Sequence, residues 1–463
     1  MKKIKIGFMP LYIKLYDDIN LNVRGRLDEF YEKLAVALEG EGFDVVRNPF
    51  CRIKPEFEAC VAKFESENCD CIVTWHAAYS PSLESIDALA GTDLPIVVLD
   101  TTETYDFYHS ADPDAINLNH GIHGVMDMTN MLLRRGKAYA IAAGHFPQSD
   151  VIEKAGRLVK AAAGAASLKG SRVGTIGGSF DGMGDFLISD EELLETFGVT
   201  AVYSDGKQLT ALQSSVTDEE IEAEIEKDLE MCQVIAPFPK DTHAKTVRNC
   251  LAVRKWLEVE NLDAFTVNFR EIRPSNGLSV MPFMEACKAM ARGTGYAGEG
   301  DVLTAAITGA LLRGFGEAAF VEIFCPDWKG GSLCLSHMGE FNLALAGAKP
   351  EIKETNFIFG EADNPIVCYG CYKAGDAVFI NVFKGADGYN MLISPVEMLA
   401  GPKKDNYQGS VRGWMKPQMP LGDFLSAIST CGVTHHSALV YGAELSELEF
   451  FGKILGLNVI TVK

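Results

Sequence analysis

The sequence has 463 residues, and it lacks both a long hydrophobic run and an excess of positive charge. Its most apolar helical stretch, 302–312, falls far short of the roughly 20 residues that span a bilayer, so we expect no membrane partner. The 42 Lys and Arg residues are outnumbered by 63 Asp and Glu, which gives a formal net charge of −21. A protein that binds duplex nucleic acid needs basic side chains to replace the counterions of the phosphates, so we expect no nucleic-acid partner either.

The sequence signatures of several enzyme classes are also absent. There is no G-x-S-x-G segment for a serine nucleophile and no H-E-x-x-H segment for zinc. The glycine-rich segment 174–179 has neither the G-x-G-x-x-G spacing of a dinucleotide site nor the Lys-Ser/Thr pair of a phosphate loop. We interpret this segment as a tight turn from a strand into a helix. The alternative is a loop that faces a polar ligand.

The 12 cysteines do not form the dense pattern of a disulfide framework. Several lie inside apolar runs, and the single C-x-x-C pair, Cys368 and Cys371, would leave a tetrahedral zinc ion two ligands short. The basic start MKKIKIGFMP lacks the apolar region of a signal peptide and is typical of a first strand. These features predict reduced thiols and a cytoplasmic protein.

With 47% hydrophobic and 23% charged residues, the chain has the composition of a globular protein, and its length suggests about three domains. Short apolar runs alternate with helix-length segments through 1–170 and again through 171–320, which is typical of βαβ units around a parallel sheet. Through 321–463 short alternating runs are separated by Gly, Pro, Asn and Asp, which indicates an antiparallel sheet or a small barrel. The clearest expected strands are 4–8, 71–75, 95–99, 172–176, 264–267, 332–335, 377–383, 390–394 and 458–462, and the clearest helices are 154–168, 218–231, 244–257 and 445–455.

Two carboxylates stand out by their context. Glu299 lies in the segment 298–301 (GEGD) at the start of a predicted helix, where acidic residues near the positive end of the helix dipole are a sufficient explanation. Glu322 interrupts an apolar run at 318–324. Because an unpaired buried charge is costly, Glu322 needs a partner, which is either a salt bridge or a metal ion.

Three histidines extend this set. A lone histidine such as His337, at the end of an apolar run, is more often a hydrogen-bonded core residue, and the pair His435 and His436 before the strand at 438–440 is either exposed or ligating. Two carboxylates and at least two imidazoles together suit Mn²⁺, Co²⁺ or a similar divalent ion. Such an ion polarises a sugar carbonyl, while carboxylates move a proton between neighbouring carbons.

A series of short segments occurs in a fixed order along nearly the whole chain. They are YSP at 79–81, NLN at 117–119, HG at 123–124, GHF at 144–146, AFT at 264–266, NF at 268–269, GYAGEGD at 295–301, TAA at 304–306, FVE at 320–322, SHM at 336–338 and THHS at 434–437. In this combination the chain resembles the L-arabinose isomerase / L-fucose isomerase superfamily, and it is closer to the arabinose isomerase branch.

The resemblance implies an α/β fold of two flavodoxin-like, doubly wound parallel-sheet domains followed by a domain that contains a β-barrel. It also implies that Glu299, Glu322, His337 and His436 bind one Mn²⁺-type ion, and that Glu299 and Glu322 double as the acid/base pair that interconverts an aldose and a ketose through a cis-enediol. The assembly it implies is a homo-oligomer, a trimer or hexamer, with active sites between subunits.

The resemblance further implies a set of sugar contacts. His435 lies near the sugar, Met183 and Phe269 line the site from the second domain, and His123 closes the pocket of a neighbouring subunit. Other positions depart from the arabinose isomerases.

Tyr79 stands where arabinose isomerases have Phe, and His120 stands where they have Gln. In addition, 10–12 lacks the glutamine of the family, and Arg270-Glu271 replaces an acidic pair. We therefore expect retained isomerase chemistry on a sugar other than L-arabinose, such as a longer or modified one. A further hypothesis places His120, Arg270 or Arg273 near an anionic substituent of that sugar. The alternatives are a metal-dependent epimerase or aldolase at the same site, a non-catalytic sugar-binding protein, and an inactive homologue.

Overall fold

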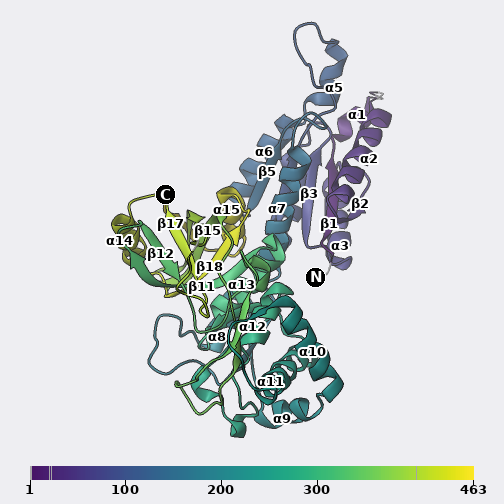
Figure 1. The fold of residues 1–463 in the computed structure, drawn as a ribbon. Helices are drawn as coiled ribbons and strands as arrows, with labels where there is room; N and C mark the ends of the chain where they lie inside the picture. Colours follow the sequence, from purple (N-terminus) through teal and green to yellow (C-terminus); the bar gives the residue numbers. More distant parts are fainter. Residues whose placement is uncertain (1–2, 20, 22, 403) are drawn as a thin grey trace. The chain divides into compact units, whose positions relative to one another are not determined.

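The computed structural model of the chain describes residues 3–19, 21, 23–402 and 404–463. The chain divides into two compact units. The first consists of the segment up to Ala166 together with Ser446–Leu455, and the second consists of Ser167–Leu445 and Gly456–Lys463. Figure 1 follows the chain through both units by colour. The finer division into domains at residues 170 and 320 stays a prediction. Within the described part of the chain, no helix combines the length and the apolar character needed to cross a membrane.

The first unit is built on a five-stranded parallel sheet with strand order β2-β1-β3-β4-β5, which is the flavodoxin-like order. Its strands are β1 (Lys5–Leu11), β2 (Asp44–Arg47), β3 (Cys71–His76), β4 (Ile96–Asp100) and β5 (Tyr139–Ala143). Its helices are α1 (Lys14–Asp18), α2 (Arg24–Gly40), α3 (Lys54–Ser66), α4 (Ser82–Gly91), α5 (Ile116–Asn119), α6 (Ile122–Arg134), α7 (Val151–Ala166) and α15 (Leu445–Ile454). Every residue of β3 is buried, as expected for a strand covered on both faces.

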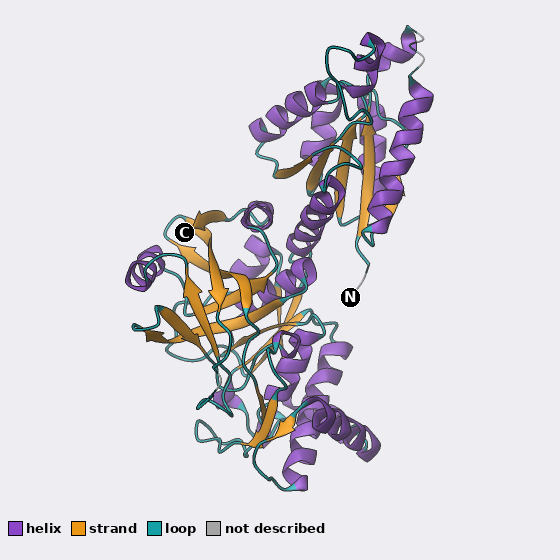
Figure 2. Ribbon diagram, turned by 45° about the horizontal axis from the view of Figure 1, so that its top comes forward, coloured by secondary structure: helices purple, strands orange, loops and turns teal. Residues whose placement is uncertain are grey.

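Two apolar clusters cover the two faces of this sheet. One is formed with α2 and α7, and the other with α3, α4 and α6. Figure 2 shows helices on both sides of the strands of this sheet. The doubly wound arrangement expected from the alternating pattern is therefore confirmed.

The second unit contains a four-stranded parallel sheet with strand order β10-β9-β6-β7. Its strands are β6 (Arg172–Ile176), β7 (Thr200–Tyr203), β9 (Ala264–Val267) and β10 (Gly295–Gly298). Its helices are α8 (Asp190–Phe197), α9 (Gly206–Ser214), α10 (Asp218–Met231), α11 (Lys240–Val259), α12 (Phe283–Ala291) and α13 (Val302–Phe315). Because the strands are parallel, the loops after β6, β9 and β10 lie at one edge of the sheet, where ligands bind in folds of this kind.

The same unit also contains a closed barrel. The strand pairings run β15-β18-β11-β12-β17-β16, and the additional β15–β16 pairing closes the ring. These strands are β11 (Ala318–Asp327), β12 (Ser332–Leu335), β15 (Gly375–Gly385), β16 (Gly388–Met398), β17 (Gly413–Pro417) and β18 (His436–Tyr441), and β19 (Asn458–Thr461) adds to β16. A separate small sheet has the order β14-β13-β8, from β8 (Gln233–Val234), β13 (Glu351–Glu354) and β14 (Ile366–Tyr369), and α14 (Leu421–Cys431) precedes β18. The expected C-terminal barrel is thus confirmed.

The interpretation of 174–179 as a tight turn into a helix is wrong. After β6 the chain forms an irregular loop over 177–189, and the next helix is α8. Gly177 and Gly178 have φ angles of 86° and 69°, a left-handed backbone that does not continue into a right-handed helix. The alternative interpretation, a loop, describes this segment.

Candidate metal centre

Glu299 lies in a strained turn at the carboxyl end of β10. Its φ of 64° is left-handed, which is uncommon for a residue with a side chain and is often found at functional sites. Gly300 follows with φ 87°, and a Cβ at this position would lie 2.3 Å from the backbone oxygen of Gly178. Asp301 then caps α13 by accepting a hydrogen bond from the backbone N–H of Thr304 at 2.9 Å. The turn that carries Glu299 is therefore fixed by a close glycine contact and by a helix cap.

Glu322 and His436 face each other in the barrel. They are direct register partners in the antiparallel pair β11–β18, so their side chains project from the same face of the sheet. His337 comes just after β12, which pairs with β11 on its other side. Three neighbouring barrel strands therefore supply three of the four predicted metal ligands.

The structure brings all four residues together. The Nε2 atom of His337 lies 3.7 Å from Oε2 of Glu322, and Nε2 of His436 lies 3.4 Å from Oε2 of Glu299. The ligand atoms of Glu322, His337 and His436 all lie within 4.8 Å of one another, and so do those of Glu299, His435 and His436. His436 belongs to both groups and links them.

These residues fit a divalent cation. His436 is 1% exposed, and its Nε2 atom has no hydrogen-bond partner among the described residues. A buried ring nitrogen without a partner is costly unless something else engages it. Imidazole nitrogen and carboxylate oxygen together form a donor set that suits several first-row divalent metals.

A second set of carboxylates contacts the Nδ1 atoms of the two imidazoles, on the side away from the candidate metal centre. Oε2 of Glu340 lies 2.6 Å from Nδ1 of His337, and Oε1 of Glu340 accepts a hydrogen bond from the hydroxyl of Tyr296 at 2.7 Å. Oδ2 of Asp301 lies 3.0 Å from Nδ1 of His436. Each of these contacts leaves Nε2 of the histidine free to face the centre, which is the usual arrangement of metal-binding histidines.

Glu340 and Asp301 were not predicted from the sequence to have this role. A signal was present for Glu340, because it follows His337 by three residues in the segment 337–340, HMGE. Asp301 had already been noted as part of GEGD, but its contact with His436, 135 residues further on, depends on the tertiary fold.

The two carboxylates at the centre have opposite electrostatic environments. Burial acts to raise the pKa of Glu299, but the imidazoles of His435 and His436 outweigh burial and hold this pKa well below its ordinary value. Burial raises the pKa of Glu322, and the nearby imidazoles offset only part of this effect. Two carboxyl groups whose pKa values are pushed apart are typical of an acid/base pair.

Neighbouring carboxylates raise the pKa values of the two buried imidazoles, His436 and His337. Burial acts to lower the pKa of His436, but Asp301 and Glu299 raise it to about 10. Burial likewise opposes the charged form of His337, and Glu340 raises its pKa above the ordinary value. A cation that binds here therefore has to displace protons from the histidines.

His435 lies at the edge of this centre. Its Nε2 atom is 3.6 Å from Oε2 of Glu299, and its Nδ1 atom is 2.7 Å from Oδ2 of Asp185. The same oxygen of Asp185 accepts a hydrogen bond from the backbone N–H of His435 at 2.9 Å. The adjacent Phe186 stacks on His436, with ring centroids 5.0 Å apart and an interplanar angle of 10°. No pattern in the sequence indicated a role for either Asp185 or Phe186.

The other predicted contacts of the second unit lie in loops after β6 and β9. Met183 is half-buried in the loop 177–189, whose Phe180 donates its backbone N–H to the backbone oxygen of Glu299 at 2.9 Å. Phe269 packs against Phe180, with ring centroids 5.4 Å apart. Arg270 lies over the Phe180 ring at 5.3 Å, and this loop therefore joins the predicted contacts to the turn that carries Glu299. Arg273 forms an ion pair with Glu271.

His120, His123 and Tyr79 belong to the first unit, whereas the four predicted metal ligands belong to the second. The ring centroids of His120 and His123 are 5.9 Å apart, and Nε2 of His120 lies 2.7 Å from the hydroxyl of Tyr16. The hydroxyl of Tyr79 donates to Asp127 of α6 at 3.3 Å. Asp127 and His123 both belong to α6, so this helix joins the segments that carry the three predicted contacts.

Three consecutive family models match the chain. Residues 26–170 match the L-arabinose isomerase N-terminal domain, 192–313 the central domain and 317–458 the C-terminal domain.

Similar full-length proteins carry the same description. The L-arabinose isomerase of Acidothermus cellulolyticus is 24% identical over 421 residues, which cover 87% of this chain and 82% of that protein. The L-arabinose isomerase of Geobacillus thermodenitrificans is 23% identical over 437 residues, 91% of this chain and 86% of that protein. That of Shouchella clausii is 23% identical over 469 residues, 98% of this chain and 93% of that protein.

Proposed function

Because the chain belongs to the L-arabinose isomerase family and is an aldose–ketose isomerase, we propose that it depends on a divalent cation held by Glu299, Glu322, His337 and His436. The observation that carries this proposal is that the candidate ligand atoms fall into two close groups that share His436, whose Nε2 atom has no hydrogen bond among the described residues. The contacts of Glu340 and Asp301 with the two Nδ1 atoms support it further.

A bound Mn²⁺ or Co²⁺ ion supplies Lewis acidity, which polarises the sugar carbonyl and stabilises charge on the neighbouring oxygen. In the proposed reaction of an aldose, Glu299, with its lowered pKa, takes the proton from C2. Glu322, with its raised pKa, gives a proton to the carbonyl oxygen on C1, and the product is a cis-enediol. Glu322 then takes the proton from the C2 hydroxyl while Glu299 returns its proton to C1, which yields the ketose and restores both groups.

We also propose that the substrate is a sugar other than L-arabinose. His435, Met183 and Phe269 would contact it from the second unit, where Asp185 holds the ring of His435. In a homo-oligomer, a trimer or hexamer, Tyr79, His120 and His123 of a neighbouring subunit would close the pocket. The hydroxyl of Tyr79 and the imidazole of His120 give this end a hydrogen-bonding character that suits a differently substituted sugar.

A cytoplasmic location is part of the proposal. All 12 cysteines are free thiols, and eight of them are buried: Cys51, Cys60, Cys69, Cys71, Cys232, Cys250, Cys287 and Cys368. Free thiols are the usual state of cysteine in a reducing compartment.

The metal and the acid/base pair are tested together. We expect chelator-treated protein to lose turnover and to regain it with Mn²⁺ or Co²⁺. Glu299→Gln and Glu322→Gln should each lower kcat by about 100-fold or more, the usual contribution of a general acid or base, with the circular dichroism spectrum unchanged. Glu397→Gln, an exposed position on the barrel strand β16, is the matched control and should keep full activity. Normal turnover by either active-site variant would refute the assignment.

The substrate and the proton-transfer step are tested with a panel of aldoses and ketoses in deuterated water. The panel includes L-arabinose, deoxy sugars and acidic sugars, and NMR records deuterium at C1 or C2. We expect a larger kcat/KM for another sugar than for L-arabinose, with deuterium in the product. A clear preference for L-arabinose would contradict the proposed specificity. Turnover without any deuterium uptake would indicate a hydride shift in place of proton transfer.

A further inference from the structure

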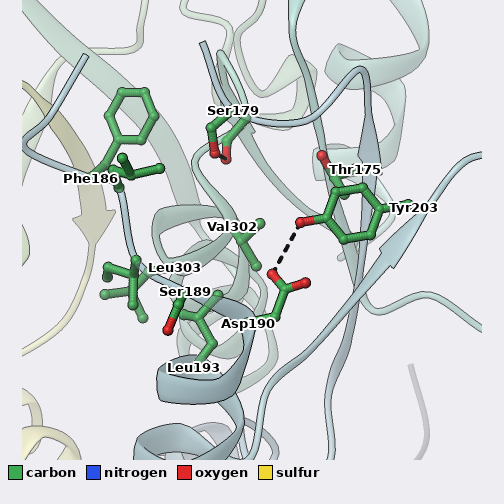
Figure 3. Close-up of a pocket in the computed structure, with 12 residues that line it drawn as sticks. Thr175, Ser179, Phe186, Ser189, Asp190, Leu193, Tyr203, Val302 and Leu303 are labelled. Atoms are coloured by element: carbon green, nitrogen blue, oxygen red, sulfur yellow. Dashed lines mark hydrogen bonds between the residues drawn. The ribbon is translucent and has the colours of Figure 1, made fainter. Parts of the chain in front are cut away.

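A cavity of about 310 Å³ lies beside the metal centre and includes none of its four residues. Its walls come from the ends of β6 and β7, the loop 177–189, and the first turns of α8 and α13, all within the second unit. Figure 3 shows side chains from these elements around it. The volume is at the lower end of the range of small-molecule sites in proteins, which begins at about 300 Å³.

A buried hydroxyl without a partner lines this cavity. Thr175 is 2% exposed, and its Oγ1 atom has no hydrogen bond among the described residues. Buried polar atoms in native proteins nearly always have a partner, so this hydroxyl of a lining residue is a candidate contact for a ligand. Thr175 takes no part in the proposed isomerisation.

The remaining polar groups of the wall provide further donors and acceptors. The hydroxyl of Tyr203 donates to Oδ1 of Asp190 at 3.1 Å, as drawn in Figure 3 next to Thr175. Oδ2 of Asp190 takes no part in that hydrogen bond and can accept another from a ligand. The hydroxyl of Ser179 donates to the backbone oxygen of Gly300 at 3.2 Å, which leaves the lone pairs of that hydroxyl available.

The apolar side of the cavity and its charge restrict the class of ligand. Leu193, Val302 and Leu303 form an apolar surface that suits the C–H groups of a sugar. Asp190 is the only charged side chain of the lining, and the first turn of α8 adds Glu191 and Glu192 nearby, so an anion is disfavoured. A ligand with several hydroxyls and no charge satisfies both the polar and the apolar parts.

We propose that this cavity is a second binding site, which takes an uncharged sugar or polyol independently of the metal. It shares walls with the metal centre but none of its ligands. Phe186 lines the cavity and stacks on His436, and Gly300 lines it directly after Glu299. Because the cavity includes none of the four candidate metal ligands, binding in it should survive removal of the metal.

The test uses the full-length, chelator-treated protein and titration calorimetry with xylitol, and with D-sorbitol as a six-carbon probe. We expect saturable binding of one molecule per chain. Thr175→Val and Asp190→Asn should each weaken it at least fivefold, whereas Glu322→Gln should leave it unchanged.

Two control variants match the chemistry of the substitutions outside the lining. Thr200→Val makes the same change at the exposed start of β7, and Glu191→Gln removes the same charge one position from Asp190. Neither control should change the affinity. The midpoint of thermal unfolding is recorded for every variant, so that loss of fold is recognised.

A measurement on the unsubstituted protein stands beside the variants. In hydrogen–deuterium exchange of the metal-free protein, xylitol should protect peptides that contain 175–190 and 200–203. The absence of saturable binding, loss of binding in Glu322→Gln, or protection confined to peptides around 322, 337 and 436 would each overturn the proposal. Equal affinity in Thr175→Val, Asp190→Asn and the unsubstituted protein would overturn it too. None of these readouts requires turnover, so failure of the proposed reaction is seen separately in the activity assay.

Discussion

Glu340 holds His337 with a carboxylate that is 2% exposed and engaged on both oxygens. Glu340→Gln keeps the size of the side chain but removes the charge that favours the correct tautomer and orientation of the imidazole. We expect the affinity for Mn²⁺ or Co²⁺ to fall by about 10- to 100-fold, the usual effect of losing such a partner. Competition with a chromophoric chelator measures this affinity.

Glu354→Gln is the control for that experiment. Glu354 lies at the end of β13, and no ion pair of its carboxylate is found among the described residues. This variant should bind the metal with unchanged affinity. If Glu340→Gln also bound it normally, the contact with His337 would have no part in metal binding.

At the same scale, the sequence indicated the residues with chemical character but not their supports. Glu322 was noticeable because a carboxylate in an apolar run needs a partner, and the structure places it opposite His436. The ring of His436 is oriented by Asp301, which lies 135 residues earlier in the chain. No local pattern encodes such a contact, because it arises only when α13 packs beside β18. The ligand roles themselves stay predictions.

The turn between β10 and α13 requires a glycine at position 300 for two reasons. Gly300 has a left-handed φ of 87°, and a Cβ there would meet the Gly178 oxygen at 2.3 Å. Gly316, at the other end of α13, has φ 77° but open space around it. Gly316→Ala should therefore cost only the backbone strain, about 1–3 kcal/mol of the free energy of unfolding. Gly300→Ala should cost clearly more, because the loop 177–189 must also move.

Urea unfolding of the two variants measures this difference. The same shift of the turn should displace Glu299, so Gly300→Ala should also lose turnover while Gly316→Ala keeps it. Equal destabilisation of the two variants would show that the contact with Gly178 is not limiting.

Elements with a strong local pattern were predicted closely, and those without one were not. The strand 172–176 and the helix 218–231 agree with β6 and α10. The strand β10 was missed, because its sequence Gly-Tyr-Ala-Gly has little intrinsic strand preference, and only pairing with β9 and burial under α13 make it a strand. The loop 177–189 was missed because nothing in its sequence shows where its glycines must turn.

Over the whole chain, the candidate ligands tie together elements that begin at β10 and end at β18, all within the second unit. A ligand that binds the folded state stabilises the segments that hold it. Helix α15 follows β18 in sequence but belongs to the first unit, and β19 returns to the second. Metal binding should therefore stabilise the chain in a pattern set by the units and not by distance along the sequence.

Hydrogen–deuterium exchange with and without Mn²⁺ distinguishes these two patterns. We expect protection to rise in peptides from β10, β11, β12 and β18 and to stay unchanged in peptides from β1 to β5. The decisive peptide is α15, which should remain unchanged although it begins only a few residues after β18 ends. The Glu322→Gln variant serves as the control and should lose most of the protection. Protection of α15 equal to that of β18 would mean that the metal stabilises the two units as one, and absence of protection at β11 and β18 would remove the barrel from the metal site.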